Sequence, residues 1–223
     1  MTAHETPSPT LSRRPRKRFW GWGTLDVVLS AAETERLRAM AGHLGAPLCD
    51  AREPREADFD LPAPRVAPPA SLAAICSASR YDRLTHSLGK SFADCARLWL
   101  RRVPDAVDWV AFPDDEQAVV DLLDWAASAR VAVLPFGGGS SVCGGVEPAL
   151  GEPHAGALAI DLERLNRVLD FDRVSRAARI QAGALGPELE AQLKPHGVTL
   201  RHFPQSFEFS TLGGWIAPCR RWR

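Results

Sequence analysis

Hydrophobic and polar residues are distributed very unevenly along the chain. Residues 1–18 combine Pro, Ser, Thr and a basic cluster with almost no apolar side chains. Such a segment buries too little surface to offset the entropy lost on ordering, so a disordered basic tail is predicted. Residues 47–69 are dense in proline and acidic side chains. Because proline removes backbone donors and interrupts helices, an irregular surface segment is predicted there.

Two helices are predicted from capping signals and helical spacing. Ser30 is followed three residues later by Glu33, which is the spacing of a capping box, and apolar residues then recur at helical intervals as far as Gly45. This segment is predicted to be a short amphipathic helix. A second helix is predicted with Pro187 in its first turn and Gly197 just past its end.

A strand, a helix and a second strand are predicted in the middle of the chain. Residues 107–112 form a short apolar run that ends at a proline, which is typical of a strand. Either Asp114 or Asp115 can cap the following helix, whose apolar face is broad enough to lie on a sheet. Residues 131–134 form the next strand. This order, with short connections, predicts a parallel pair joined by a crossover helix.

Further strands are predicted in the last third of the chain. Residues 157–162 and 177–182 are strand-like, and residues 165–171 form an extended or hairpin segment between them. Residues 198–200 are predicted to form another strand.

Charge and hydropathy argue against several kinds of partner. Lys plus Arg and Asp plus Glu both number 27, so a formal net charge of zero gives no general field to attract nucleic acid or a membrane surface. No apolar stretch approaches the roughly 20 residues that a membrane-spanning helix needs. A soluble protein is therefore expected, and its hydrophobic content of 45% permits an ordinary core.

The cysteines favour a cytoplasmic protein. They are odd in number, far apart and without zinc-ligand spacing, so they are interpreted as reduced thiols and no metal site is predicted. The five are Cys49, Cys76, Cys95, Cys143 and Cys219. Residues 12–19 resemble a twin-arginine export signal, but the apolar segment that should follow is missing.

A run of three glycines and two serines, the glycine loop (residues 137–141), directly follows the strand predicted at residues 131–134. Successive amides of such a loop can turn inward and a phosphate can approach them closely, at a place where ligands bind in open α/β sheets. It matches neither a Walker loop nor a Gly-x-Gly-x-x-Gly fingerprint, and a turn that binds nothing is the alternative. With its lead-in, the candidate binding residues are Pro135, Phe136, Gly137, Gly138, Gly139, Ser140 and Ser141.

A second loop (residues 203–216) is also rich in small hydroxyl residues and contains a glycine pair. Its aromatic side chains can flank a flat ring or pack in a core, and taken alone they favour the core. Glu208 can accept a hydrogen bond from a ligand or be solvated. The candidate binding residues are Pro204, Gln205, Ser206, Phe207, Glu208, Phe209, Ser210, Gly213 and Gly214.

The two loops form one longer pattern. It reads Pro-x-Gly-Gly-Gly-Ser-Ser-Val, then a strand-rich stretch, then Pro-x-Ser-x-Glu-Phe-Ser-Thr-x-Gly-Gly-Trp. This pattern resembles alkylglycerone-phosphate synthase and its bacterial FAD-linked relatives, which are oxidoreductases of the vanillyl-alcohol oxidase type. The likeness extends to residues 19–23, 83–89 and 102–107, and so covers almost everything from Phe19 to Ile216.

The resemblance implies an α+β fold, a PCMH-type FAD-binding domain of two α/β subdomains with FAD between them. Residues 137–141 would hold the pyrophosphate, and residues 204–210 with Gly213 and Gly214 would run along the flavin. Several superfamily members attach the flavin covalently to a histidine in the glycine loop. This loop has none, so dissociable FAD is expected. No catalytic residue is assigned, because the family's tyrosine and histidine cluster has no counterpart here.

The resemblance also divides the chain into four segments. After the tail of residues 1–18, a helical and irregular segment is expected at 19–100 and a partial FAD-binding domain at 101–217. Residues 218–223 depart from the family, which continues with Thr-Arg and a run of small residues. The hypothesis is a frameshift at or just before Pro218, which would leave the domain incomplete at its C-terminus and without a substrate-binding cap.

The resemblance implies a role in ether lipid precursor synthesis for the complete protein. The family reaction exchanges the acyl group of an acyl-dihydroxyacetone phosphate for a fatty alcohol, so a small-molecule or lipid substrate is expected. The alternatives are an FAD-dependent dehydrogenase for a 2-hydroxy acid such as D-lactate or glycolate, a non-catalytic remnant, or a small nucleotide-binding module. The 223 residues alone are expected to be inactive, to bind FAD weakly and to expose a sheet edge prone to aggregation.

Overall fold

The computed structural model describes residues 14–43, 45, 52–148, 151 and 154–217, and it contains two compact units. One unit runs from Trp22 to Ala51 together with the first 18 residues, and the other contains residues 19–21 and everything from Arg52 onward. Most of the predicted tail, at 1–13, and the predicted departure at 218–223 lie outside the described residues.

The first unit contains the helix α1 (Ala31–Gly42), which begins at the predicted cap. The Ser30 hydroxyl accepts a hydrogen bond from the Glu33 amide, and the Glu33 carboxylate accepts one from the Ser30 amide at 2.9 Å. The helix ends three residues before Gly45, and Leu44 lies outside the described residues. None of its residues is buried, and Met40 is 62% exposed, so the predicted apolar face packs against no core within this unit.

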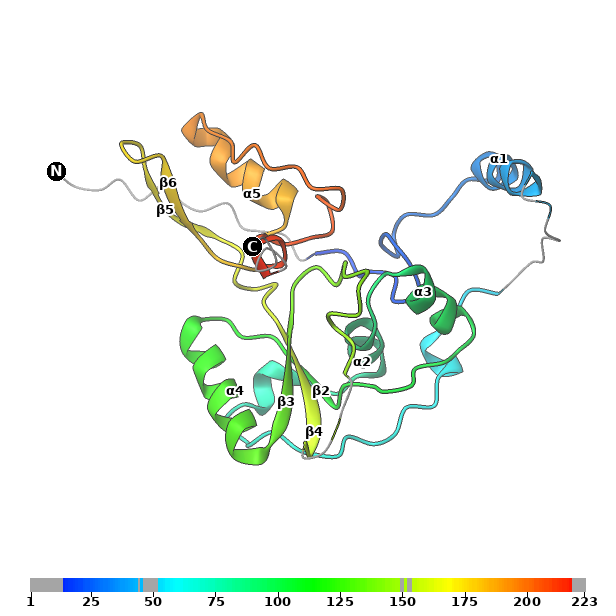
Figure 1. The fold of residues 1–223 in the computed structure, drawn as a ribbon, viewed down its shortest axis with the longest axis horizontal. Helices are drawn as coiled ribbons and strands as arrows, with labels where there is room; N and C mark the ends of the chain where they lie inside the picture. Colours follow the sequence, from blue (N-terminus) through cyan, green and yellow to red (C-terminus); the bar gives the residue numbers. More distant parts are fainter. Residues whose placement is uncertain (1–13, 44, 46–51, 149–150, 152–153, 218–223) are drawn as a thin grey trace. The chain divides into compact units, whose positions relative to one another are not determined.

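The second unit is built on a four-stranded sheet. Its order is β1-β2-β4-β3, with β2 and β3 both parallel to β4 and β1 antiparallel to β2 (Figure 1). The strands are β1 (Cys76–Ser77), β2 (Trp109–Ala111), β3 (Val131–Phe136) and β4 (Gly156–Asp161). The strands predicted at 107–112, 131–134 and 157–162 are thus confirmed with shifted ends.

The predicted direct pairing of the second and third strands is wrong. β2 and β3 are parallel, as the strand-helix-strand order predicted, but β4 lies between them and pairs with both. All six residues of β4 are buried. A strand that is covered on both faces belongs in the centre of a parallel sheet, and this separates the two earlier strands.

Helices cover both faces of this sheet. On one face, α4 (Glu116–Ala129) packs its buried Leu122 and Ala126 against Leu158 and Ile160 of β4. On the other face lies α2 (Arg80–Ser87), whose Arg83 side chain donates to the Val107 carbonyl oxygen at 2.7 Å. Figure 1 shows the two helices on opposite sides of the strands.

The helix α2 and its neighbour α3 (Phe92–Trp99) lie in the segment that the sequence predicted only as helical and irregular. Each begins after a serine whose hydroxyl accepts a hydrogen bond from the amide three residues later, Ser79 from Asp82 and Ser91 from Asp94. Between Arg52 and Pro69 the chain is irregular, as predicted, apart from one 3-10 turn, Glu56–Asp58. Further 3-10 turns are Ala73–Ile75 and Lys194–His196.

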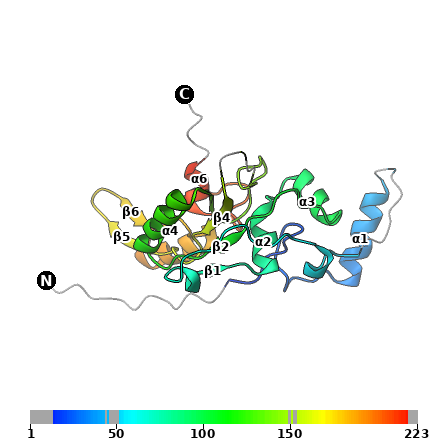
Figure 2. The same cartoon turned by 90° about the horizontal axis from the view of Figure 1, so that it is seen from below.

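The rest of the second unit is a hairpin with two helices. The hairpin pairs β5 (Val168–Asp172) with β6 (Ala177–Ile180) in antiparallel fashion, with a shift of register between Val168 and Asp170, and it confirms the predicted hairpin segment. The helix α5 (Gly186–Leu193) has Pro187 in its first turn, as predicted. The short helix α6 (Leu212–Ile216) was not predicted, and it lies at the carboxyl end of β3 (Figure 1, Figure 2).

The strand predicted at 198–200 is wrong. These residues have no strand structure, and the Leu200 amide donates to the Glu190 side chain at 3.0 Å rather than to a neighbouring strand. The apolar character of Val198 instead serves packing, because its side chain lies against the cluster of Ala184, Leu189 and Leu193.

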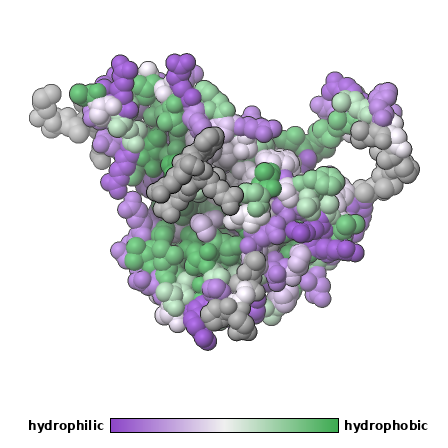
Figure 3. Space-filling view, viewed as in Figure 1, coloured by the Kyte–Doolittle hydropathy of each residue, from purple (hydrophilic) through white to green (hydrophobic). Residues whose placement is uncertain are grey.

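The surface of the second unit carries hydrophobic residues over the hairpin and α5, and again over α4 (Figure 3). On α4 the exposed members are Val120 and Leu123, and on the hairpin they are Leu169 and Val174. These side chains lie outside the core clusters and face solvent within the described part of the chain.

Candidate functional site

The glycine loop leaves the carboxyl end of β3 and is fixed at both ends. At its start, the carbonyl oxygen of Phe136 accepts a hydrogen bond from the Leu162 amide at 3.1 Å. At its end, the Ser141 carbonyl oxygen accepts one from the Lys90 amide at 2.7 Å, and the Ser141 hydroxyl accepts one from the Gly145 amide at 3.1 Å. These hydrogen bonds anchor the backbone of the glycine loop at both ends.

The middle of the loop offers unpaired hydrogen-bond donors. Gly139 is in the left-handed region, with φ 73°, which allows successive amides to face one side. Among the described residues, the amides of Gly139, Ser140 and Ser141 and the Ser140 hydroxyl have no hydrogen-bond acceptor. Gly139 is buried, so its unpaired amide is costly unless a ligand oxygen accepts from it. This donor set fits a pyrophosphate.

The structure brings the glycine loop and the second loop into direct contact. A Cβ atom at Gly138 would overlap the carbonyl oxygen of Phe209, and one at Gly137 would overlap the Thr211 hydroxyl. The absence of side chains at these two positions therefore lets one loop pack on the other. Sequence reasoning attributed all three glycines to room for a phosphate, and it missed the buried Thr211, which also caps α6.

Several predicted binding groups of the second loop are used within the loop itself. The Ser210 hydroxyl donates to the Ser206 carbonyl oxygen at 2.8 Å and accepts from the Trp215 indole at 2.6 Å. The Phe207 ring stacks on Trp215 with ring centroids 6.2 Å apart, so these aromatics are partly core, as the sequence taken alone favoured.

Other predicted members of the second loop face outward. Gln205, Glu208 and Gly214 are exposed, and Pro204, Ser206, Phe209 and Gly213 are half-buried. Of the lead-in residues, Pro135 is exposed and Phe136 is buried beneath the glycine loop. The outward side chains are therefore the accessible part of the predicted flavin side.

Gly89, at the end of the family-like run 83–89, and the adjacent Lys90 contact the glycine loop. A Cβ atom at Gly89 would overlap the Ser141 carbonyl oxygen, and the next residue, Lys90, holds that oxygen by its amide. The buried Lys90 ammonium donates to the Phe19 carbonyl oxygen at 2.9 Å. The sequence signal that could have indicated this support is the run of residues 83–89.

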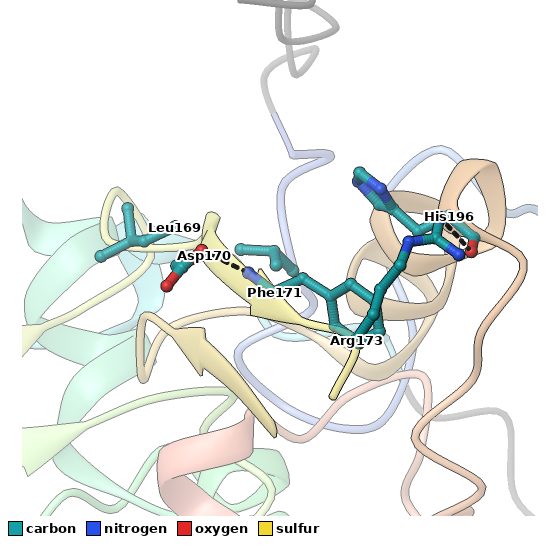
Figure 4. A pocket seen from close by; sticks show the side chains of 6 residues that line it. Leu169, Asp170, Phe171, Arg173 and His196 are labelled. Atoms are coloured by element: carbon teal, nitrogen blue, oxygen red, sulfur yellow. Dashed lines mark hydrogen bonds between the residues drawn. The ribbon is translucent and has the colours of Figure 1, made fainter. Parts of the chain in front are cut away.

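An open pocket lies away from both loops, between β5 and the end of the 3-10 turn after α5 (Figure 4). The guanidinium of Arg173 lies 5.9 Å from the centroid of the Phe171 ring and donates to the His196 carbonyl oxygen at 3.3 Å. None of the predicted binding residues lines this pocket. The hydrogen bond from Arg173 to His196 joins the hairpin to the neighbouring turn.

Metal and membrane sites find no support in the described residues. No group of three or more His, Cys, Asp or Glu side chains converges there as metal ligands. No helix in the same part of the chain has the length and apolar character needed to cross a bilayer. Of the cysteines, Cys76, Cys95 and Cys143 have free thiols, and burial raises the pKa of Cys76 to about 11, whereas Cys49 and Cys219 lie outside the described residues.

Known proteins similar to this chain are named as a synthase and as a dehydrogenase. Alkyldihydroxyacetonephosphate synthase of Dictyostelium discoideum is 44% identical over 137 residues, which are 61% of this chain and 22% of that protein. A solved structure of alkyldihydroxyacetonephosphate synthase aligns with a TM-score of 0.78 and 30% identity, over 91% of this chain and 43% of that one. D-2-hydroxyglutarate dehydrogenase of Xanthomonas citri pv. viticola is 39% identical over 87 residues, which are 39% of this chain and 17% of that protein.

These likenesses confirm the predicted α+β fold and its relation to the synthase. The chain spans about a fifth of the length of the curated relatives that it matches. A family model described as the FAD binding domain matches residues 107–219, which is half of the chain and includes both loops. The chain therefore belongs to the FAD binding domain family, whose cofactor is FAD.

Proposed function

We propose that the chain binds FAD through the two loops, with the pyrophosphate at residues 137–141 and the flavin along residues 204–210, Gly213 and Gly214. The observation that carries this proposal is the set of unpaired amides at Gly139, Ser140 and Ser141, next to the packed second loop. When bound, FAD supplies the redox-active ring. The chain's own residues bind and orient it, and the amide dipoles offset the negative charge of the pyrophosphate.

We propose further that the FAD is dissociable, because no histidine lies in the glycine loop. Acid denaturation of the loaded protein would then release all of the flavin into the supernatant. Flavin that stays with the precipitated protein would contradict this proposal.

For the complete protein we propose ether lipid precursor synthesis by exchange of an acyl group for a fatty alcohol. The support is the 44% identity to an alkyldihydroxyacetonephosphate synthase. The matched stretch covers 22% of the length of that protein. The second candidate is oxidation of a 2-hydroxy acid, which is favoured by the similarity to D-2-hydroxyglutarate dehydrogenase. Reduction of the flavin of the complete protein by D-2-hydroxyglutarate, D-lactate or glycolate, without alkyl exchange, would favour the second candidate.

For this protein we also propose a cytoplasmic location, supported by the free thiols.

FAD binding is tested with the Ser140 hydroxyl. Ser140→Ala removes a donor that has no partner in the described chain, so it should weaken FAD binding by roughly five- to tenfold, or about 1 kcal/mol, without lowering the melting temperature. Titration followed by flavin fluorescence measures the affinity. Ser128→Ala is the matched control, because this exposed serine on α4 bonds only to the Trp125 carbonyl oxygen.

Two results would count against the proposed site. If the parent chain has no affinity for FAD, the proposed function fails. If Ser140→Ala and Ser128→Ala bind FAD as tightly as the parent, the pyrophosphate lies elsewhere. The glycines are poorer probes, since a side chain at Gly138 would also push the two loops apart.

A further inference from the structure

We propose that His86 is a positioning residue for FAD, which keeps the glycine loop in its binding shape by holding the Phe136 ring beneath it. This inference rests on the proposed pyrophosphate site. His86 lies on α2 and is 4% exposed, so it is separated from solvent and from any ligand. It can act on FAD only through its neighbours.

Both ring nitrogens of His86 have partners. Nδ1 lies 2.7 Å from the Asp82 carbonyl oxygen, and because that oxygen can only accept, Nδ1 is the donor. Nε2 lies 2.8 Å from Oδ2 of Asp161, which is itself 2% exposed. The ring is therefore fixed between helix α2 and the end of β4.

One side chain thus meets the ends of three parallel strands. Asp161 is the last residue of β4, Phe136 is the last of β3, and Phe112 directly follows β2. The centroid of the His86 ring is 4.1 Å from that of Phe136 and 5.8 Å from that of Phe112. Carboxyl ends of strands form the edge at which ligands bind in such sheets, so His86 lies directly behind that edge.

The contact with Phe136 continues to the loop. A Cβ atom at Gly139 would lie 2.6 Å from Cζ of Phe136, so the ring fills the space under the left-handed residue. Asp161 contributes from the other side, because its Oδ1 accepts from the Glu163 amide at 2.8 Å and fixes the turn whose Leu162 amide holds the Phe136 carbonyl oxygen. Movement of His86 would release both the ring and this turn.

A buried histidine that only stabilises the fold is the competing explanation, and Ser87 gives the matched control. It is the next residue on α2, it is fully buried, and its hydroxyl ties the helix to the Val107 amide at 3.0 Å. Its hydrogen bonds within the described residues go to Arg83 and Val107, and none joins it to the glycine loop. Ser87→Ala therefore weakens the attachment of α2 while leaving the support under Gly139 in place.

The test uses the 223-residue chain with and without FAD. The chemical shifts of the Gly139 α-protons report the position of the Phe136 ring through its ring current. In His86→Gln these shifts should move toward random-coil values, and the Kd for FAD should rise roughly tenfold. Ser87→Ala should lower the melting temperature but leave the shifts and the Kd at the parent values.

Variants of Asp161 alter the His86–Asp161 hydrogen bond from the β4 side. They test the inference even if His86→Gln does not fold. Asp161→Ala should reproduce the Gly139 shift change, and Asp161→Asn, whose carboxamide can still form a hydrogen bond with Nε2, should restore the parent shifts. Unchanged Gly139 shifts in both His86→Gln and Asp161→Ala, or an equal change in Ser87→Ala, would overturn the inference. Because the shifts are read without FAD, a parent chain that fails to bind FAD refutes the proposed function while the shifts still decide the inference on His86.

Discussion

Asp108 is a buried carboxylate of the second unit that accepts several hydrogen bonds. It is buried, its oxygens accept from the Arg65 side chain and amide, and Oδ2 also accepts from the Ala157 amide at 2.7 Å. Burial by itself would raise its pKa, but these hydrogen bonds outweigh burial and hold the pKa of Asp108 below its ordinary value of 3.8. The Asp108 carboxylate therefore links Arg65, in the irregular segment before β1, to Ala157 of β4.

The lowered pKa gives a pH-dependent contribution to stability. A carboxylate whose pKa is lowered on folding stabilises the protein above its unfolded pKa, and the contribution is lost as the pH falls through the folded pKa. Asp108→Asn should therefore lower the free energy of unfolding by about 2 kcal/mol at neutral pH, and this gap should narrow below pH 3.8. Urea unfolding at both pH values measures it. Asp105→Asn, a change of the same kind at an exposed site, should show neither effect.

At the scale of single elements, the sequence permits either of two adjacent aspartates as the cap of α4. The structure assigns it to Asp115, whose side chain accepts from the Ala118 amide at 2.7 Å, while Asp114 forms an exposed ion pair with Arg164 at 3.0 Å. Only the backbone angles at the helix start distinguish the two, and the local sequence permits either. The predicted broad apolar face of α4 is buried only in part, because Leu122 and Ala126 are buried whereas Val120 and Leu123 are exposed.

The capping difference is measurable. Asp115→Ala should destabilise the second unit by about 1 kcal/mol, because it leaves an amide of the first turn without its acceptor. Asp114→Ala should change the stability by less than about 0.5 kcal/mol, because the ion pair that it removes is exposed. Thermal unfolding of both variants gives the comparison. Equal destabilisation would show that the cap contributes no more than the ion pair.

At the scale of the whole second unit, an open sheet edge lies beside exposed apolar side chains. β3 is at one edge of the four-stranded sheet, and α4 next to it exposes Val120 and Leu123. An unpaired strand edge beside apolar surface favours association between molecules.

Self-association of the 223-residue chain is therefore expected. Replacing both apolar side chains, as in Val120→Lys with Leu123→Glu, should reduce light scattering at a given concentration without changing the net charge. Ser128→Lys with Gln117→Glu places the same charges at polar positions of the same helix and should leave scattering unchanged. Equal scattering from the parent and both double variants would mean that this face takes no part in association.

The sequence by itself determined the periodic elements and the two loops. The strands β2 to β6, α4, α5 and the capping box of α1 depend on local spacing and caps, and the loop residues were recognisable by composition and by resemblance. Tertiary structure alone decided that β4 separates β2 from β3 and that residues 198–200 pack without pairing. It also decided that Gly138 meets Phe209 and that His86 stands behind Phe136. These last two contacts join residues 50 or more positions apart in the chain, and a local pattern carries no information about which distant side chain fills the adjoining space.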